Sequence, residues 1–346
     1  MTKRIEYIDA MRGFTMLLVI MFHIEWTFGG SGDYGYNNFI EVFRMPLFFF
    51  ISGWVFYKTN RVWNASSIKS ILQKKFIVQI IPTATFLLVY LYIFKSIKTD
   101  YLGSDKTGYW FTFVLFEYFG IYVLTERLLN KRNLALKEVW VGSAMILISL
   151  LSFCYAKYYV QYSTELGSWK AVLGFFSFVK FKHLIFFWLG TIAKRFFSDF
   201  IKFTDNKYAM TGMVLLFFAI TLCPHVNYVL GEYFIYLAFG IAGICVVFTF
   251  FRVHESLFVK NNVLGRVFQF VGRRTLDIYL LHYFFLPQNL EFIGSFLKQY
   301  NNGAIDVLIM LLLAIWIIAI CLLISEIIRL SPLLEHYLFG VQRKRE

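Results

Sequence analysis

The amino-acid sequence predicts an all-α, polytopic integral membrane protein with about ten transmembrane helices and both termini in the cytoplasm. Hydrophobic residues make up 59% of the 346 residues and charged residues only 16%, which is more apolar than a typical soluble domain. Several apolar runs reach about 18 residues or more, close to the roughly 20 that a spanning helix needs. Lysine and arginine lie mainly in alternate connecting segments, as the positive-inside rule requires of cytoplasmic loops.

Ten apolar segments, separated by charged, glycine-rich or turn-forming stretches, are the predicted spans. They are 10–28, 39–57, 76–95, 110–126, 138–155, 176–193, 209–223, 231–251, 272–291 and 305–328. The first is followed by "GGSGDYGYNN" and not by a small-residue cleavage site, so it is expected to be a retained helix. The next seven are followed by "KTNR", "SIKTD", "RLLNKRN", "AKYYVQ", "KR", "PHVN" and "RVHES". The ninth closes with "PQNLE" and the tenth stops before Arg329.

The basic residues test the number of spans. With the N-terminus inside, 24 of the 34 lysines and arginines fall in cytoplasmic segments, six fall on the opposite side, and four lie within or at the edges of spans. This bias supports ten spans with both termini cytoplasmic. The net charge of +13 is explained by these loops, which hold orientation and face anionic lipid. Nothing in the sequence resembles a nucleic-acid module.

The chain is expected to form one transmembrane domain over residues 1–346. No internal repeat or low-complexity tract divides it. The four cysteines lie in apolar runs without metal-ligand spacing, so they are expected to be packing residues and not disulfides or metal ligands. They are Cys154, Cys223, Cys245 and Cys321. No metal site and no tightly bound cofactor are expected.

Two ionisable residues of the first span share one helix face. Arg12 and His23 are 11 residues apart, which is about three turns plus 20° on a helix, and His23 lies roughly 16 Å deeper in the membrane. Such a polar stripe is expected to face the bundle interior, because ionisable groups facing lipid are costly. The alternatives are an interfacial anchor for the arginine and a packing role for the histidine.

Other spans place ionisable residues in the same membrane layer. Arg44, Glu25 and Glu117 lie close to the depth of His23, and His282 lies near mid-depth. An ion pair of Arg44 with Glu25 or with Glu117 would neutralise the buried arginine. The sequence leaves open which pair forms, and a purely structural ion pair is the alternative.

Five sequence blocks, in this order, resemble acyltransferase family 3. They are "IDAMRGFTMLLVIMFH", "RMPLFFFISGW", "YWFTFVLF", "FFWLGTIAKR" and "GRRTLDIYLLHYFF". The first contains the spacing R-x10-H, and the set covers essentially the whole chain. The resemblance implies ten core helices and transfer of an acyl group, most often acetyl from cytoplasmic acetyl-CoA. The implied acceptor is a hydroxyl of a carbohydrate that is outside the cytoplasm or linked to a lipid or to peptidoglycan.

The resemblance also assigns residues. It implies that Arg12 and His23 serve the acyl donor or its transfer, and that two further blocks are functional. These blocks are Ser52 with Gly53, and Tyr279 with His282. Ser52, Tyr279 and His282 are expected to bind the acyl-CoA. Many relatives have histidine at Arg44 and leucine at Thr112, so a carried-over role is not assigned to Arg44. Some relatives carry an extracytoplasmic SGNH-type hydrolase domain. This chain ends at Glu346, so it is expected to act alone or with a separate partner.

The predicted mechanism places acetyl-CoA phosphates among cytoplasmic cations. The expected ligands are Arg273, Arg274 and Arg12, with Lys74 or Lys75 as weaker candidates. The pantetheine arm would then carry the thioester to His23. A neutral His23 would deprotonate the acceptor hydroxyl or would itself take the acyl group, and Glu25 would orient its ring.

Two other classes of function fit the same composition. A transporter or flippase of a polar or lipid-linked metabolite also uses intramembrane charges and proline-interrupted helices, although it often shows internal duplication. A non-catalytic membrane scaffold is the other class, and it would have no affinity for CoA. The expected location of the enzyme is the inner (cytoplasmic) membrane, as a multi-pass protein in contact with lipid.

Overall fold

The computed structural model describes most of the chain. The described residues are 5–28, 35–59, 61–94, 105–129, 134–162, 172, 174–219, 229–287, 290–300 and 302–340. Within these ranges the protein consists of helices and turns, and no strand occurs. The prediction of an all-α fold is therefore confirmed for the described part of the chain.

Five helical segments in the described ranges are long and apolar enough to cross a membrane. They are Glu6–Thr27, Ala65–Phe94, Leu136–Tyr158, Val229–Val253 and Gly303–Arg329, and two shorter apolar helices cover Phe43–Phe56 and Lys207–Ala219. Each of the ten predicted spans overlaps a described helix. The total of ten spans and the cytoplasmic location of both termini stay predictions.

The segment predicted as the ninth span is not one continuous helix. Helix α12 covers Val263–Arg273 and helix α13 covers Thr275–Phe285, and the backbone leaves helical geometry at Arg274 (φ −105°, ψ 16°). Eleven residues make a helix about 16 Å long, roughly half of the hydrocarbon thickness. The apolar content of the segment predicted a single span, whereas α13 is a short helix that must pack within the protein.

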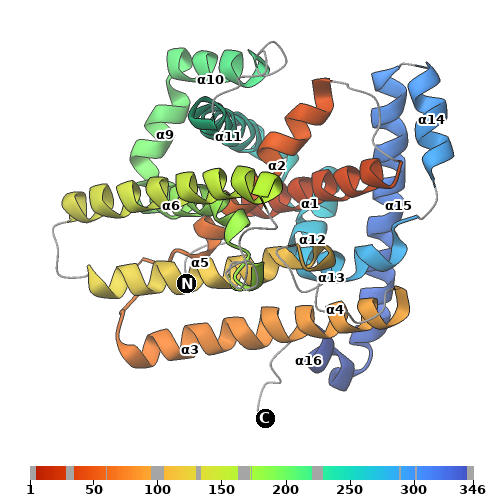
Figure 1. The fold of residues 1–346 in the computed structure, drawn as a ribbon, viewed down its shortest axis with the longest axis horizontal. Helices are drawn as coiled ribbons and strands as arrows, with labels where there is room; N and C mark the ends of the chain where they lie inside the picture. The colour runs from red at the N-terminus through yellow and green to blue at the C-terminus, as the bar shows by residue number, and fades with distance from the viewer. Residues whose placement is uncertain are drawn as a thin grey trace. The chain divides into compact units, whose positions relative to one another are not determined.

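Contacts divide the chain into two units, and the first contains residues 1–51, 198–225 and 234–330. Its elements include α1 (Glu6–Thr27), α2 (Gly35–Phe56, as far as Ile51), α9 (Phe197–Asp205), α10 (Lys207–Ala219), α11 (Val229–Val253), η6 (Glu255–Leu257), α12, α13, α14 (Glu291–Tyr300) and α15 (Gly303–Arg329). Helix α1 packs along α12 and crosses α15, and α13 also packs on α15 (Figure 1).

The second unit contains residues 52–197, 226–233 and 331–346. Its elements are α3 (Ala65–Lys75), η1 (Phe76–Ile80), α4 (Ile81–Phe94), η3 (Lys106–Gly108), α5 (Trp110–Leu128), α6 (Leu134–Tyr162), η4 (Phe178–His183), α8 (Leu184–Arg195) and α16 (Pro332–Phe339). A π-helical turn, η1, joins α3 to α4. Helix α6 packs on η4 and α8, and α16 packs on α4. The prediction of a single domain over the whole chain stays a prediction.

Local sequence signals fix where several helices begin. Asn262 and Asn302 precede α12 and α15, and their side chains accept hydrogen bonds from the backbone amides of Leu264 (2.9 Å) and Ala304 (3.1 Å). Ser331 caps α16 in the same way. Each cap satisfies an amide that has no partner inside its helix. The cap at Asn262 therefore sets the start of α12, the helix against which α1 packs.

Candidate active site

The polar stripe of α1 lies against α13. The Nη2 atom of Arg12 donates a hydrogen bond to Oγ1 of Thr275 over 2.9 Å. Farther along α1, Nε2 of His23 lies 3.2 Å from the hydroxyl oxygen of Tyr283. The two partners follow one another along α13 in the same order, so α1 and α13 run in the same direction. One short helix therefore contacts both ends of the stripe.

Two imidazoles and a phenol meet at the deeper end of the stripe. The ring centroids of His23 and His282 are 5.2 Å apart, and those of His282 and Tyr283 are 3.9 Å apart. The Nδ1 atom of His282 lies 2.8 Å from the carbonyl oxygen of Tyr279 and 3.1 Å from that of Ile278. Carbonyl oxygens only accept hydrogen bonds, so Nδ1 of His282 carries the proton. In the neutral ring, Nε2 then holds the lone pair.

Each histidine keeps one ring nitrogen without a hydrogen bond. Nδ1 of His23 and Nε2 of His282 are both buried, and neither has a hydrogen-bond partner among the described residues. Leaving a buried polar atom unsatisfied costs about 1–3 kcal/mol. Such atoms are rare in folded proteins and call for an explanation. A polar atom of a bound ligand would satisfy them.

Arg44 approaches the same region of α1. Its guanidinium carbon lies 3.2 Å from the ring centroid of Phe22, the residue before His23, which is a cation–π contact. The expected layer of ionisable groups thus contains Arg44 and His23 in the first unit. Glu25 is half-buried, and it follows His23 by two positions, so the two side chains point about 200° apart around α1. The role of Glu25 in orienting the His23 ring stays a prediction.

Glu117 belongs to the second unit, on α5, so the Arg44–Glu117 pair stays a prediction. Within the described residues, Oε2 of Glu117 is buried and has no hydrogen-bond partner. In the same unit, Nζ of Lys106 donates to Oγ of Ser177 over 2.6 Å and to the carbonyl oxygen of Phe175 over 3.0 Å. Positive φ angles at Lys106 (43°) and Ser177 (50°) hold this contact. Sequence reasoning could not predict this contact, because the two residues are 71 positions apart.

The Arg12 end of the stripe is packed closely against α12 through two glycines. A Cβ atom on Gly13 would collide with the carbonyl oxygen of Phe268, and a Cβ atom on Gly272 would collide with the carbonyl oxygen of Asp9. The backbones of α1 and α12 therefore touch directly, as small residues allow in helix pairs within membranes. Because Gly13 follows Arg12, this contact fixes the position of the arginine on α1.

Arg273 and Arg274 have different surroundings. Arg274 lies 2.5 Å from Oε1 of Glu326 and 3.6 Å from Oδ2 of Asp277. Arg273 is exposed, and its Nη1 atom donates a 3.4 Å hydrogen bond to Oε1 of Gln269. Of the two predicted phosphate ligands, Arg274 is committed to carboxylates and Arg273 is accessible.

The remaining predicted residues fall into two groups. Tyr279 is buried and accepts the hydrogen bond that fixes the His282 ring. Ser52 and Gly53 belong to the second unit, where a Cβ atom on Gly53 would collide with the carbonyl oxygen of Phe187. The glycine of this block thus serves the packing of α2 on α8. Lys75, also in the second unit, lies over the ring of Phe119 at 4.5 Å.

Sequence reasoning missed three residues of the first unit. Thr275 and Tyr283 contact the two ends of the α1 stripe, and both lie in the block "TLDIYLLHYFF", but only the packing of α13 on α1 shows their partners. Asp277 is 3% exposed and accepts hydrogen bonds from Ser325 (2.6 Å) and Arg329 (2.8 Å). A buried aspartate in an apolar segment was the available signal.

The comparison with known families gives one match. A family model described as an acyltransferase domain, acyltransferase family 3, matches residues 5–326, which is nearly the whole chain. The match begins just before α1 and ends near the end of α15, so it includes the α1 stripe and α13. No curated protein and no solved structure matches the chain.

Proposed function

Because this chain belongs to acyltransferase family 3, we propose that it transfers an acyl group, most often acetyl, from cytoplasmic acyl-CoA to a carbohydrate hydroxyl. The acceptor lies outside the cytoplasm or is linked to a lipid, and the product is an O-acylated glycan of the cell envelope. The observation that carries this proposal is the buried cluster of His23, His282 and Tyr283, which is joined by one face of α1 to Arg12.

The proposed setting is the inner (cytoplasmic) membrane, with ten spans and both termini inside. The distribution of lysine and arginine supports this arrangement. The parallel course of α1 and α13 supports it as well, because both belong to odd-numbered predicted spans and must then run outward. In this orientation Arg12 faces the cytoplasmic donor, and His23 lies about three turns closer to the acceptor.

Donor binding is proposed at the cytoplasmic end of the stripe. The phosphates of acyl-CoA pair with Arg12 and Arg273, because guanidinium groups bind phosphate oxygens in bidentate geometry. Arg274, which pairs with Asp277 and Glu326, adds positive charge near this site without contacting the phosphates directly. The thin pantetheine arm then extends beside α1 toward Tyr279 and His282. No cofactor beyond the co-substrate is proposed.

The chemical step requires one neutral imidazole. In the proposed state, Nε2–H of His23 donates to the hydroxyl oxygen of Tyr283, which leaves the lone pair on the buried Nδ1. This nitrogen takes the proton of the acceptor hydroxyl while the hydroxyl oxygen attacks the thioester carbonyl. The C–S bond then breaks, and the CoA thiolate takes up the proton from the imidazolium. The products are the O-acyl ester and free CoA.

A second route uses the same nitrogen as a nucleophile. Nδ1 of His23 attacks the thioester, CoA leaves, and the acceptor hydroxyl then removes the acyl group from the imidazole. Incubating the protein with labelled acetyl-CoA in the absence of acceptor distinguishes the routes. Mass-spectrometric detection of label on a His23 peptide indicates the acyl-enzyme, and its absence under conditions that support turnover indicates direct transfer.

The activity test compares matched histidine variants. Purified protein in lipid nanodiscs is given acetyl-CoA and a membrane extract as acceptor, and free CoA is measured. His23→Ala is expected to lower CoA release at least about 100-fold, because a general base typically contributes that much or more. His254→Ala, at an exposed position, is expected to keep the activity. Wild-type turnover by His23→Ala would overturn the assignment.

The acceptor is tested in cells. A strain that lacks the gene is expected to lose one O-acetyl signal from its envelope glycans, and expression of the wild type, but not of Arg12→Gln, restores it. If the protein were a transporter, the strain that lacks the gene would still carry O-acetylated glycans when an acetylated precursor is supplied, because the acetylation step itself would be intact. Acetyl-CoA should also raise the thermal midpoint of the purified enzyme, since a ligand of the folded state stabilises it, whereas a scaffold shows no shift.

A further inference from the structure

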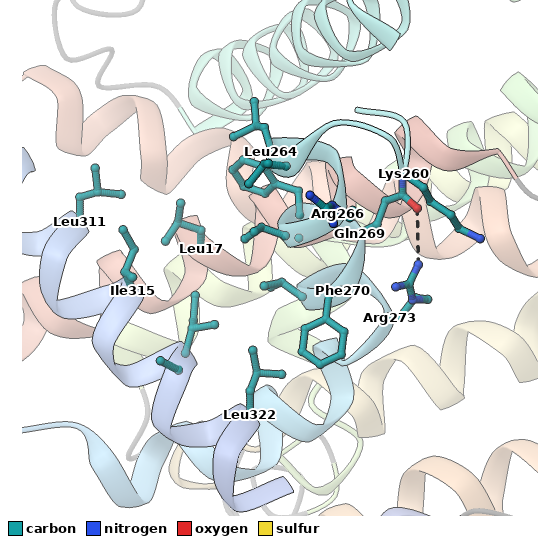
Figure 2. Close-up of a pocket in the computed structure, with 17 residues that line it drawn as sticks. Leu17, Lys260, Leu264, Arg266, Gln269, Phe270, Arg273, Leu311, Ile315 and Leu322 are labelled. Carbon is teal, nitrogen blue, oxygen red and sulfur yellow. Dashed lines mark hydrogen bonds between the residues drawn. The ribbon is translucent and has the colours of Figure 1, made fainter. Parts of the chain in front are cut away.

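A large apolar groove lies in the first unit on a different side of α1 from the polar stripe. Its volume is about 920 Å³, in the range of ligand-binding pockets. Leu17 of α1, Val267 and Phe270 of α12, and Ile315 and Leu322 of α15 form its apolar part (Figure 2). Gly13 and Leu17 point about 100–140° away from Arg12 around α1. The groove is therefore separate from the His23 cluster.

The walls of the groove face the surroundings of the protein, not its core. Val263 is 66% exposed, Val267 55% and Ile315 52%. In a water-soluble protein such a surface would be costly, but α15 is one of the candidate membrane spans. An occupant of the apolar part of this groove is therefore expected to be a molecule that is itself dissolved in the membrane.

Three cations lie along the edge of the same groove. Lys260, Arg266 and Arg273 line it and are exposed, and in Figure 2 Lys260 and Arg273 gather on the side away from the leucines of α15. Arg266 and Arg273 are seven residues apart on α12, so they share one face of that helix. The groove thus combines an apolar floor with a basic edge.

Other basic residues of the unit have acidic partners. Arg252, Arg274 and Arg329 all form ion pairs with carboxylates. Among the described residues, no ion pair involves the side chains of Lys260, Arg266 or Arg273. The nearby carboxylate of Glu6 accepts hydrogen bonds from the backbone amide of Lys260 and, at 3.3 Å, from Gln269. The basic edge therefore keeps positive charge available for an anionic ligand.

We propose that this groove binds an anionic glycerophospholipid of the cytoplasmic leaflet. Its acyl chains lie on Leu17, Val267 and Ile315, and its phosphate faces Lys260 and Arg266. Basic pockets between membrane helices on the cytoplasmic side are suited to anionic headgroups. The side of the membrane follows from the proposed orientation of the chain, but the lipid site does not depend on the transferase chemistry.

Lipid binding can be measured directly on the purified protein by native mass spectrometry. Dioleoyl phosphatidylglycerol and dioleoyl phosphatidylcholine are offered at equal concentration, since they share acyl chains and differ in headgroup charge. The wild type is expected to bind phosphatidylglycerol preferentially. The double variant Lys260→Gln/Arg266→Gln should lose about thirtyfold in affinity for it, because each basic residue contributes about 1 kcal/mol, or about fivefold. Lys202→Gln/Lys207→Gln, which removes two exposed cations outside the groove, should change nothing.

A second variant tests the apolar part of the groove. Val267→Trp fills the space beside Leu17 from an exposed position, so folding should persist and phosphatidylglycerol binding should fall with the headgroup cations intact. Equal binding of the two lipids by the wild type would overturn the proposal. Tighter binding of undecaprenyl phosphate than of phosphatidylglycerol would also overturn it, because the groove would then bind a lipid carrier of the acceptor.

The lipid-binding experiment and the activity experiment can contradict their proposals independently of each other. Lys260 and Arg266 are not among the residues that contact the proposed substrates. Loss of lipid preference in their double variant with normal CoA release would support the lipid site alone. Conversely, an inactive wild type that still prefers phosphatidylglycerol would overturn the transferase proposal and leave the lipid site standing.

Discussion

His282 holds its imidazole on the backbone of its own helix, with Nδ1 2.8 Å from the carbonyl oxygen of Tyr279. This hydrogen bond fixes the tautomer and turns Nε2 away from the helix backbone, while the ring lies tilted against those of Tyr283 and His23. The cluster is thus positioned by α13 as much as by α1. Variants of α13 should therefore separate positioning from chemistry.

Tyr283→Phe is expected to lower kcat about tenfold and to leave the KM for acetyl-CoA unchanged. It removes the hydroxyl that lies 3.2 Å from Nε2 of His23, and one hydrogen bond is worth about 0.5–1.5 kcal/mol. CoA release at varied acetyl-CoA concentration measures both constants. Tyr208→Phe, at a position that is 78% exposed, serves as the control. A raised KM with unchanged kcat would mean that Tyr283 binds the donor and does not orient His23.

Gly272→Ala is expected to destabilise the first unit by about 1–3 kcal/mol, the usual cost of overpacking. The added methyl group meets the carbonyl oxygen of Asp9 and pushes α1 away from α12. Gly212→Ala is the matched control, because a Cβ atom there has no neighbour within 4 Å and alanine is the better helix former. Thermal unfolding in detergent should show a lower midpoint for the first variant and an equal or higher one for the second.

Asp277→Asn is expected to destabilise the protein by about 3 kcal/mol, because it removes the charge of the buried carboxylate that pairs with the half-buried Arg329 and Arg274. The carboxylate accepts hydrogen bonds from Ser325 and Arg329 and faces Arg274. Asp199→Asn, whose carboxylate pairs with Lys202 at the exposed surface, should cost little. Chemical denaturation monitored by tryptophan fluorescence compares the two. An unchanged stability for Asp277→Asn would show that this ion-pair cluster is not needed for folding.

Lys194 should make the stability of the protein depend on pH. Burial, followed by the charge of Lys58, lowers the pKa of Lys194 from 10.5 to about 8. Below pH 8 the Lys194 ammonium is charged in both the folded and the unfolded protein, so the full cost of burying the charge lowers the stability of the folded protein. Between pH 8 and 10.5 the folded protein has released the proton and the unfolded chain has not, so stability rises with pH.

Lys194→Met removes this contribution. Its thermal midpoint should exceed that of the wild type at pH 7, and the difference should shrink as the pH approaches 10. Lys207→Met, at an exposed position, should follow the wild type at every pH. A difference between Lys194→Met and the wild type that stays constant across this range would show that packing, and not charge, is responsible.

The sequence alone determined the class of protein and the family. Apolar runs and basic loops predict membrane helices because a segment in lipid must satisfy its backbone internally, and this signal is local. The placement of Arg12 and His23 on one face of α1 is also a local property, since helix periodicity places residues eleven positions apart on the same face. The order of the five blocks then identifies the family, which the match over residues 5–326 confirms.

The tertiary structure decided which side chains meet. Thr275 and Tyr283 are 263 and 260 positions from their partners on α1, and no helix periodicity links residues so far apart. It also decided that the predicted ninth span is interrupted at Arg274, where hydropathy gave no sign of a break. Finally, it separated Arg274 from Arg273. The two are adjacent in sequence, but the packing of α13 on α15 places one guanidinium beside carboxylates, while the other lies at the edge of the groove.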